Sequence, residues 1–291
     1  MILQQTLNGL ALGMAYALVA VGYSLVFGIL RLVNFSHGSV YAFGAHMVIF
    51  LAGFHFGLVP AIVMGVILTG LLGILIDKMA LSPLRKKKSP GISSLITTIG
   101  ISYIIQNMLM MFFGSEKKPF PPLFKNNIIT IAGAKMNTMQ LMMFLVSILL
   151  LVVLSVLVKY TKIGLAMRSV EQSQVVSSLM GINTNLVIAF TFFLGGASAA
   201  IASVLISGYY QIVYPTMGFM IGLKAFAAAV LGGIGLFHGS IAGGLVIGVA
   251  EALAATIFGS AYRDSVAFII LILVLLVRPA GLFGKKGIEK V

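Results

Sequence analysis

Long apolar stretches free of charged residues follow one another along the chain, separated by short basic segments. Residues 1–30 and 139–158, for example, contain no Asp, Glu, Lys or Arg. About 20 apolar residues are enough to cross a bilayer as a helix. In hydrocarbon only helices and closed barrels satisfy the main chain, and a barrel needs alternating apolar and polar residues that this chain lacks. The pattern therefore predicts membrane-spanning helices.

We predict an all-α, polytopic membrane helical bundle of about eight or nine transmembrane helices, forming one domain over residues 1–291. The expected spans are 8–30, two within 32–76 that are separated near the Gly- and Pro-containing stretch 53–60, 93–113, 139–158, 185–207, 216–234, 240–258 and 264–281. Eight is the alternative to nine, because the short second segment could be re-entrant.

Composition agrees with a membrane protein. Apolar residues make up 60% of the 291 residues, charged residues only 9%, and the mean hydropathy is +1.12, whereas a soluble domain carries about 25% charged residues. The net charge of +13 would suggest a nucleic-acid partner in a soluble protein. Here the Lys and Arg residues lie in short loops between spans, so we expect no nucleic-acid partner.

The basic clusters predict the orientation of the bundle, since Lys and Arg in short loops stay in the cytoplasm. The clusters are 78–88, 159–168 and 285–290, and an even number of predicted spans separates each successive pair. All three clusters, and with them the C-terminus, are therefore expected in the cytoplasm. With nine spans the N-terminus and the Pro-containing loop 114–138 fall outside.

The sequence offers no catalytic or metal site. It contains no Walker A string, so we expect no bound cofactor, and any ATP must bind to a partner. His37, His46 and His55 are nine residues apart, which places successive members on opposite helix faces. No Ser, His and Asp grouping suggests a hydrolase, so a transport subunit is expected rather than an enzyme.

The segment 160–184 is long for a connection in a helical bundle, and its apolar and polar residues alternate as in an amphipathic helix. Gly181 and Asn183 provide a helix stop. Such a helix on the cytoplasmic face could dock into a groove of a partner protein or pack on its own bundle. The pattern alone does not decide between these two.

Two charges lie inside predicted spans, Lys224 and Glu251, each roughly 10–12 Å below the outer boundary at 1.5 Å per residue. An isolated charge at such a depth costs about 3 kcal/mol or more. We therefore predict that the two pair in the bundle interior, for a structural or a functional reason. Asn34, His37, Gly232 and Gly233 are further candidates for a polar path, although small residues also serve close helix packing.

Several strings of the chain are long and specific. They are Asn34-Phe35-Ser36-His37-Gly38, Gly164-x-Ala166-x-Arg168, Gly181-Ile182-Asn183, Lys224-Ala225-Phe226, Ala229-Val230-Leu231-Gly232-Gly233-Ile234-Gly235, Gly248-x-Ala250-Glu251-Ala252-Leu253 and Pro279-x-Gly281. In these strings the chain resembles the permease subunits of branched-chain amino acid ABC importers, of the LivH type.

The resemblance implies a bacterial inner-membrane subunit that translocates leucine, isoleucine and valine. It also implies a second, similar permease, two cytoplasmic ABC ATPases that bind ATP, and a periplasmic binding protein that delivers the solute. Related permeases carry urea or short amides, so these solutes, or other amino acids, are an alternative. A secondary transporter or channel is a further alternative, but it should bear more embedded carboxylates than Glu251.

By the same resemblance, the segment 160–184 carries the coupling helix that inserts into an ATPase. The coupling residues implied are Gly164, Arg168, Glu171, Gly181 and Ile182. Many ABC permeases carry a Glu-Ala-Ala-x-x-x-Gly string in this loop. If Gly181 is that glycine, the glutamate position is occupied by Val175, so no carboxylate role carries over there.

Overall fold

The computed structural model describes residues 2–54, 57–87, 89–124, 127–131 and 134–284. Among these described residues, nine principal helices make up the bundle: α1 (Ile2–Leu30), α2 (His37–Gly53), α3 (Leu58–Ile76), α5 (Gly91–Phe113), α6 (Thr138–Tyr160), α9 (Thr184–Tyr210), α10 (Met217–Gly232), α11 (Phe237–Ile257) and α12 (Arg263–Val277). The π-helical turn η1 (Asp77–Leu81) and α4 (Ser82–Lys86) continue α3, and η2 (Ser260–Tyr262) precedes α12. The all-α membrane fold is therefore confirmed.

Each of these nine helices occupies one predicted span, and the break within 32–76 falls between α2 and α3. Seven of the helical segments in the described residues are long and apolar enough to cross a membrane. The remaining two, α2 and α10, have 17 and 16 residues. At 1.5 Å per residue they reach about 25 Å, less than the ~30 Å hydrocarbon core.

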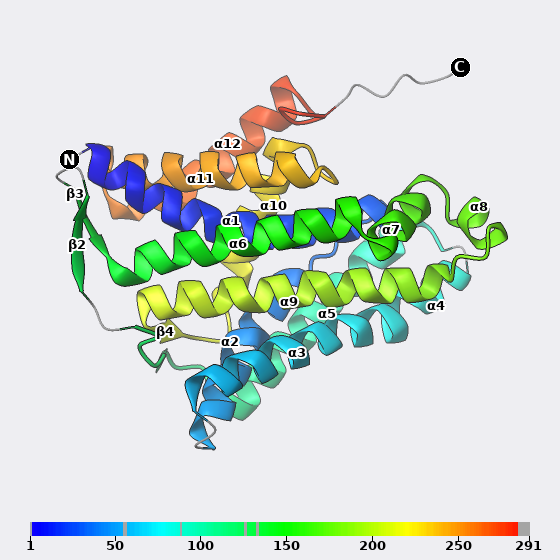
Figure 1. The fold of residues 1–291 in the computed structure, drawn as a ribbon, viewed down its shortest axis with the longest axis horizontal. Helices are drawn as coiled ribbons and strands as arrows, with labels where there is room; N and C mark the ends of the chain where they lie inside the picture. The colour runs from blue at the N-terminus through cyan, green and yellow to red at the C-terminus, as the bar shows by residue number, and fades with distance from the viewer. Residues whose placement is uncertain (1, 55–56, 88, 125–126, 132–133, 285–291) are drawn as a thin grey trace.

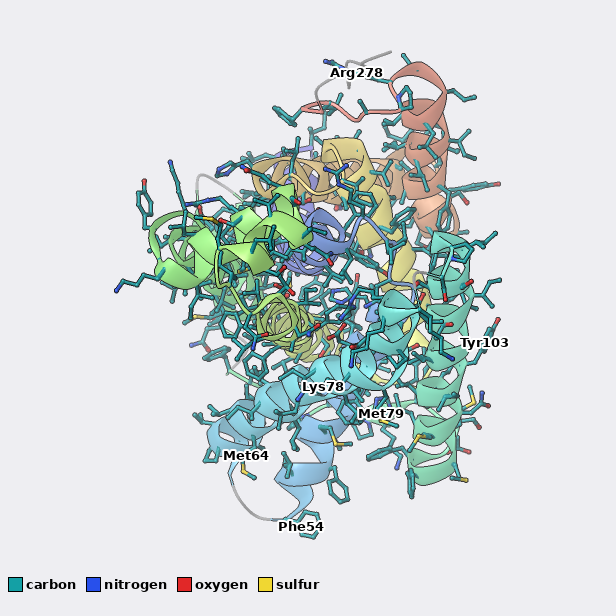
Figure 2. All side chains as sticks on the ribbon, turned by 90° about the vertical axis from the view of Figure 1, so that its right-hand side faces the viewer. Phe54, Met64, Lys78, Met79, Tyr103 and Arg278 are labelled. Carbon is teal, nitrogen blue, oxygen red and sulfur yellow. The ribbon has the colours of Figure 1, made fainter. Side chains whose placement is uncertain are left out.

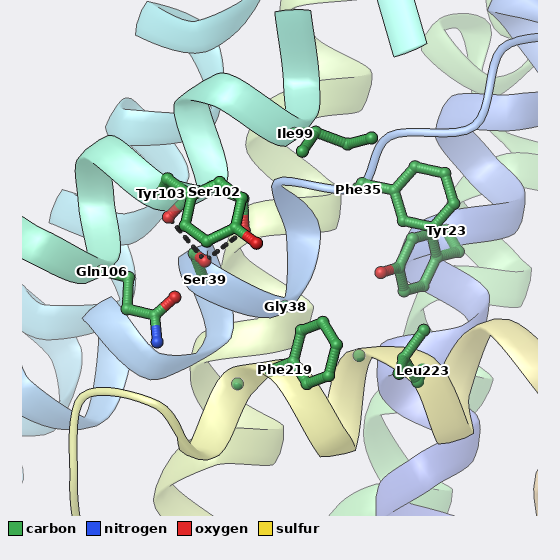
Figure 3. A pocket seen from close by; sticks show the side chains of 12 residues that line it. Tyr23, Phe35, Gly38, Ser39, Ile99, Ser102, Tyr103, Gln106, Phe219 and Leu223 are labelled. Atoms are coloured by element: carbon green, nitrogen blue, oxygen red, sulfur yellow. Dashed lines mark hydrogen bonds between the residues drawn. The ribbon is translucent and has the colours of Figure 1, made fainter. Parts of the chain in front are cut away.

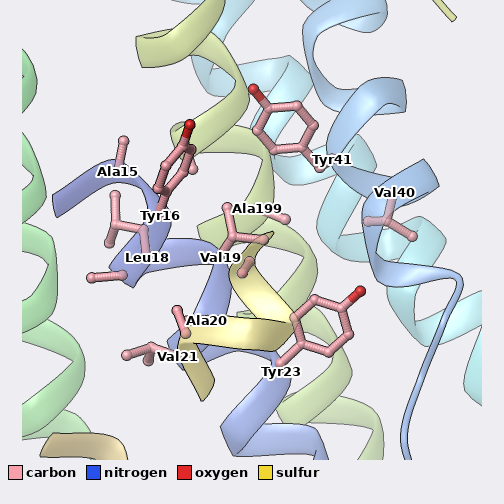
Figure 4. Close-up of a cluster of buried hydrophobic side chains, with 14 of the residues drawn as sticks. Ala15, Tyr16, Leu18, Val19, Ala20, Val21, Tyr23, Val40, Tyr41 and Ala199 are labelled. Carbon is pink, nitrogen blue, oxygen red and sulfur yellow. The ribbon is translucent and has the colours of Figure 1, made fainter. Parts of the chain in front are cut away.

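Helix α1 lies at the centre of the bundle and is the most deeply buried span. It packs closely on α11 because both helices carry glycine at the contact. A Cβ atom at Gly13 would lie 2.8 Å from the carbonyl oxygen of Gly244, and one at Gly244 would lie 2.7 Å from Cα of Ala17. Figure 4 shows the buried side chains around α1, including Leu18 and Val21, which are fully buried.

The outer faces of α3, α5, α6 and α12 carry exposed apolar side chains, as expected of a surface that meets lipid or other apolar helices. Figure 2 shows Met64 and Tyr103 at the outer edge of the bundle, and these residues are 40% and 61% exposed. Apolar side chains thus cover the outward faces of these four helices.

One end of the bundle carries the N-terminus and short strands, and the other carries α7 (Lys162–Gln172) and α8 (Gln174–Leu179). Strands β2 (Ile128–Ile131) and β3 (Ala134–Asn137) form a hairpin, and β1 (Lys118–Pro119) pairs with β4 (Ile212–Val213). Gln4 exchanges two hydrogen bonds with the main chain of Lys135, of 2.6 and 2.7 Å. The predicted loop 114–138 therefore contains strand pairing that the hydrophobic pattern did not predict.

The helix pair α1 and α2 has the same arrangement as the pair α9 and α10, but the two pairs run in opposite directions through the bundle (Figure 1). Arg31 and Gln211 directly follow α1 and α9, and both have left-handed φ angles, of 52° and 56°. In each case an extended segment and a two-residue turn then lead into the short helix. The first turns of α2 and α10 meet at Gly38 and Gly218. The carbonyl oxygen of each glycine occupies the space that a Cβ atom on the other glycine would need.

Candidate functional site

A cluster of charges, buried at Lys224 and Glu251 and partly exposed at Arg263 and Asp264, joins α10, α11 and α12. Lys224 forms ion pairs with Glu251 and, at 2.6 Å, with Asp264, while Arg263 Nε lies 3.3 Å from Glu251 Oε1. Tyr16 of α1 accepts a 3.5 Å hydrogen bond from Lys224 Nζ. Glu251 is fully buried and Lys224 is 4% exposed. The predicted pairing of Lys224 with Glu251 is therefore confirmed, and the four charges sum to zero.

Sequence reasoning missed Arg263 and Asp264 as members of this cluster. They begin α12 at the boundary of the last predicted span, where charges are ordinary, so hydropathy gave no reason to single them out. A signal was nevertheless present, because Arg263 and Asp264 are adjacent charges of opposite sign at the end of a span. Such a cation and anion can each pair with the oppositely charged member of an intramembrane ion pair.

A cavity of about 230 Å³, which we call the α5 cavity, lies among α1, α2, α5 and α10 (Figure 3). Phe35, Ile99, Phe219 and Leu223 provide its apolar walls. Its polar lining comes from Tyr23, Ser39, Ser102, Tyr103 and Gln106. Tyr103 and Phe219 are 61% and 62% exposed, so the cavity opens on the side of the bundle.

The polar wall of the α5 cavity comes largely from one face of α5. Ser94, Thr98, Ser102 and Gln106 recur every four residues, which keeps them near one face of the helix. Ser39 Oγ of α2 lies 2.7 Å from Ser102 Oγ and donates to the Ser102 carbonyl at 3.1 Å. None of these residues carries a charge, and the span prediction rests on charge-free runs, so the sequence did not single them out.

Asn34 and His37 lie in and just after the turn that starts α2. The Asn34 side-chain oxygen accepts two hydrogen bonds from Ser36, one from the main-chain amide at 3.1 Å and one from the hydroxyl group at 2.6 Å. The His37 ring packs edge-on against Tyr23 at 4.5 Å, and its Nε2 has no hydrogen-bond partner among the described residues. Both are buried beside the α5 cavity, and they hold the turn that places Phe35 in its wall.

Gly232 and Gly233 form the tight turn between α10 and α11, away from the α5 cavity. Gly233 has a φ of 103°, which disfavours any residue with a Cβ atom. The C-terminal segment packs on this turn, with Leu282 N donating to the Leu231 carbonyl at 2.7 Å and Phe283 N to that of Gly232 at 3.3 Å. In the structure these two glycines therefore serve close packing of the turn against the C-terminal segment.

At the opposite end from the β2–β3 hairpin, Gly164 and Arg168 fix α7 against the end of α6. Gly164 packs against the carbonyl oxygens of Leu157 and Val158 where any side chain would collide. Arg168 Nη1 donates to the carbonyl oxygens of Val158, at 2.7 Å, and Lys159, at 2.8 Å. A cation that binds the last carbonyls of a helix also complements the helix dipole.

The Glu171 carboxyl lies beside Gly28 of α1 and lines a cavity of about 210 Å³, while the residue stays exposed at the rim of this cavity. Burial raises the pKa of the Glu171 carboxyl above its usual value, and the nearby Arg31 opposes this shift. Gln174, the first residue of α8, donates to the carbonyl of Ile29 at 3.3 Å. This hydrogen bond ties the start of α8 to the end of α1.

Beyond α7, helix α8 presents apolar side chains that nothing in the described chain covers. This α8 patch consists of Val175, Val176, Leu179 and Met180, which are 70, 57, 80 and 78% exposed. Gly181, with a φ of 82°, ends α8, and Ile182 N donates to the Ser177 carbonyl at 3.0 Å. Of the predicted coupling residues, Gly164 and Arg168 anchor the segment, Glu171 lines the cavity beside α1, and Gly181 and Ile182 follow the exposed tip.

Within the residues that the structure describes, no three His, Cys, Asp or Glu side chains form a group that could hold a metal ion. His55 and the basic residues Lys88, Lys285, Lys286 and Lys290 lie outside the described residues.

Comparison with known proteins identifies relatives over almost the whole chain. The family model described as "Branched-chain amino acid transport system / permease component" matches residues 5–275. The high-affinity branched-chain amino acid transport system permease protein BraD of Pseudomonas aeruginosa is 40% identical, over 99% of this chain and 98% of BraD. The corresponding LivH protein of Salmonella typhimurium is 41% identical, over 99% and 97%.

Among solved structures, PsaBC from Streptococcus pneumoniae in complex with Fab has a similar fold. The TM-score is 0.52 and the identity 11%, with 94% of this chain and 91% of that chain covered. At this identity the likeness concerns the fold alone.

Proposed function

The chain belongs to the branched-chain amino acid transport permease family, and from this premise we propose that it is the membrane-spanning permease subunit of an ATP-driven importer for leucine, isoleucine and valine. Family membership makes it a multi-pass transport component rather than an enzyme. The observation that carries the proposed solute is the full-length identity of about 40% to relatives named for these amino acids.

In the proposed assembly the α8 patch docks on an ABC ATPase in the cytoplasm of a bacterial cell. An apolar patch at the tip of a helix, rimmed by polar residues, is typical of a protein–protein contact. Two such ATPases bind the ATP, because this chain has no Walker A string. The α7–α8 end and the C-terminus then lie in the cytoplasm, and the N-terminus and loop 114–138 lie in the periplasm, where a binding protein delivers the solute.

We assign the solute path to the α5 cavity. Polar side chains at membrane depth face a bundle interior or a water-filled path rather than lipid. Here the cavity opens between α5 and α10, and Tyr103 and Phe219 stand exposed at its mouth. A second, similar permease placed against this face would close the cavity into a pore. Its aromatic and aliphatic walls suit an aliphatic amino acid, and its Ser, Tyr and Gln groups suit the polar end.

The α8 patch is tested by Leu179→Asn in the assembled transporter, with Leu186→Asn as the matched control. Leu186 is 65% exposed but lies in the first turn of α9. We expect Leu179→Asn to weaken co-purification of the ATPase and to lower uptake, and Leu186→Asn to leave both near the parent level. Equal co-purification and equal uptake for the two variants would contradict the proposal that the α8 patch contacts the ATPase.

The solute is tested by competition against uptake of labelled leucine in proteoliposomes that contain all subunits. Isoleucine and valine should compete at concentrations similar to leucine, while urea and acetamide should not compete. Competition by the amides, without competition by isoleucine and valine, would contradict the proposed solute.

A further inference from the structure

A second cavity, which we call the Tyr41 cavity, lies on the other side of the α2–α10 contact from the α5 cavity. It encloses about 250 Å³ among α2, α9, α10 and the segment before β1. Tyr41 and Ser207 line it from α2 and α9, and Lys117 and Tyr214 line it from beside the paired strands β1 and β4. It therefore lies toward the end of the bundle that carries the short strands.

Two hydroxyl groups of the Tyr41 cavity lack hydrogen-bond partners. Tyr41 is fully buried and Ser207 is 1% exposed, yet neither Tyr41 Oη nor Ser207 Oγ has a partner among the described residues. Figure 4 shows the Tyr41 ring extending from α2 with its hydroxyl group directed toward α9. Buried polar groups are nearly always hydrogen-bonded, so two orphaned hydroxyls in one cavity require an explanation.

The neighbouring serine on the same helix behaves differently from Ser207. Ser203 lies one turn earlier on α9, is equally buried, and donates to the carbonyl of Ala200 at 2.8 Å. Serine in a helix commonly makes this local bond. Ser207 does not, and its hydroxyl therefore keeps its hydrogen-bonding capacity for another group.

Lys117 adds a positive charge to the cavity lining. Its ammonium group lies 5.6 Å from the centre of the Tyr214 ring, and the described residues provide it with no ion-pair partner. The nearby cluster of Lys224, Glu251, Arg263 and Asp264 contains two charges of each sign. The lysine therefore sets the net charge of the lining.

We propose that the Tyr41 cavity is an entry subsite that binds an aliphatic amino acid before it reaches the α5 cavity. Lys117 pairs with the solute carboxylate, and the Tyr41 and Ser207 oxygens accept hydrogen bonds from its ammonium group. Met217 and Ile221 of α10 contact the aliphatic side chain. This assignment rests on the proposed function, because it takes the solute to be an amino acid that arrives from the strand-bearing end.

The two cavities are adjacent. Met217 and Ile221 line the Tyr41 cavity, whereas Gly218 and Gly222 of the same helix line the α5 cavity. The glycine contact between α2 and α10, made by Gly38 with Gly218, separates them. Passage of the solute between the two cavities therefore requires a displacement of α10 from α2 at this contact.

The absence of cysteine from the chain allows a direct test. In the assembled transporter, Ser207→Cys places a single thiol of this chain in the cavity wall, and Ser203→Cys is the matched control on the same helix. The rate of modification by a small methanethiosulfonate reagent is followed by the mass of this chain, with and without leucine. Leucinol, which has the same side chain and ammonium group but no carboxylate, provides the comparison ligand.

We expect the thiol of the Ser207→Cys variant to react, leucine to slow the reaction severalfold, and leucinol to have little effect. Adding Lys117→Gln should raise the leucine concentration needed for protection about tenfold, as for the loss of one charge-assisted hydrogen bond. The thiol of the control variant should show no leucine-dependent rate. An unreactive Ser207→Cys variant, or equal rates with and without leucine, would reduce the site to a packing cavity, and equal protection by leucinol would overturn the role of Lys117.

This readout is independent of transport. If the parent transporter takes up leucine while leucine does not protect the Ser207→Cys variant, the entry subsite is refuted and the proposed function stays in place. Failure of leucine uptake by the parent transporter refutes the proposed function itself.

Discussion

The buried pair of Lys224 and Glu251 leads to the sharpest prediction about the energetics of the bundle. Removing one member of a buried ion pair costs about 3–5 kcal/mol, because the other charge stays buried without compensation. Here the cost is reduced, since Arg263 lies 3.3 Å from Glu251 and Asp264 lies 2.6 Å from Lys224. We therefore expect Lys224→Met and Glu251→Gln each to destabilise the folded chain by about 2–4 kcal/mol.

The double variant should be far less destabilised than the sum of the two single variants. It removes one cation and one anion together, and the remaining Arg263 and Asp264 still balance. We expect a coupling free energy of about 2 kcal/mol in the double-mutant cycle. The assay is reversible unfolding in mixed micelles, followed by circular dichroism. Additive effects of the two substitutions, within about 0.5 kcal/mol, would refute the claim that the charges stabilise each other.

Three further predictions concern single positions. Gly38→Val should lower the free energy of unfolding by about 3 kcal/mol, because the valine side chain would meet the main chain of α10. Gly100→Ala should be neutral or slightly stabilising, since nothing lies within 4 Å of the Cβ position of Gly100. Thermal unfolding compares the two variants, and equal losses of stability would contradict the close contact at Gly38. Arg168→Ala should cost about 1–2 kcal/mol and lower ATP-driven uptake, because the end of α6 loses two hydrogen bonds, and an unchanged melting temperature would contradict this. Because burial raises the pKa of Glu171 above 4.5, the folded chain binds this proton more tightly than the unfolded chain, and the resulting stabilisation is complete below about pH 4.5 and is lost as pH rises through the folded-state pKa. Glu171→Gln should then be more stable than the parent at pH 7 with a difference that shrinks toward pH 4.5, and a difference independent of pH in urea titrations would be the contrary result.

Hydropathy predicted where the helices lie, because each span must satisfy its own main chain in lipid, and this requirement is local. The break between α2 and α3 was readable from Gly53, Gly57 and Pro60 for the same reason. The pairing of Lys224 with Glu251 was also predictable, since an isolated charge at that depth is costly and the spans offered few partners.

What the sequence did not reveal depends on how the helices pack. The apolar stretch 32–76 does not reveal that α2 starts only at His37, nor that the turn before it lies inside the bundle, where Ser36 is fully buried and Gly38 meets Gly218. The orphaned hydroxyls of Tyr41 and Ser207 can be recognised only when their surroundings are known. The same holds for the α5 cavity, because Ser102 and Gln106 are unremarkable until the opening beside them is seen.

The central claim, that this chain forms part of an ATP-driven amino acid pore, is tested most directly by concentrative uptake. The chain, its candidate second permease, the ATPases and the binding protein are reconstituted in proteoliposomes, and labelled leucine is followed with ATP or a non-hydrolysable analogue inside. We predict that leucine accumulates above its external concentration only when ATP is hydrolysed. Accumulation that persists with the analogue, or without the ATPase subunits, would contradict the account.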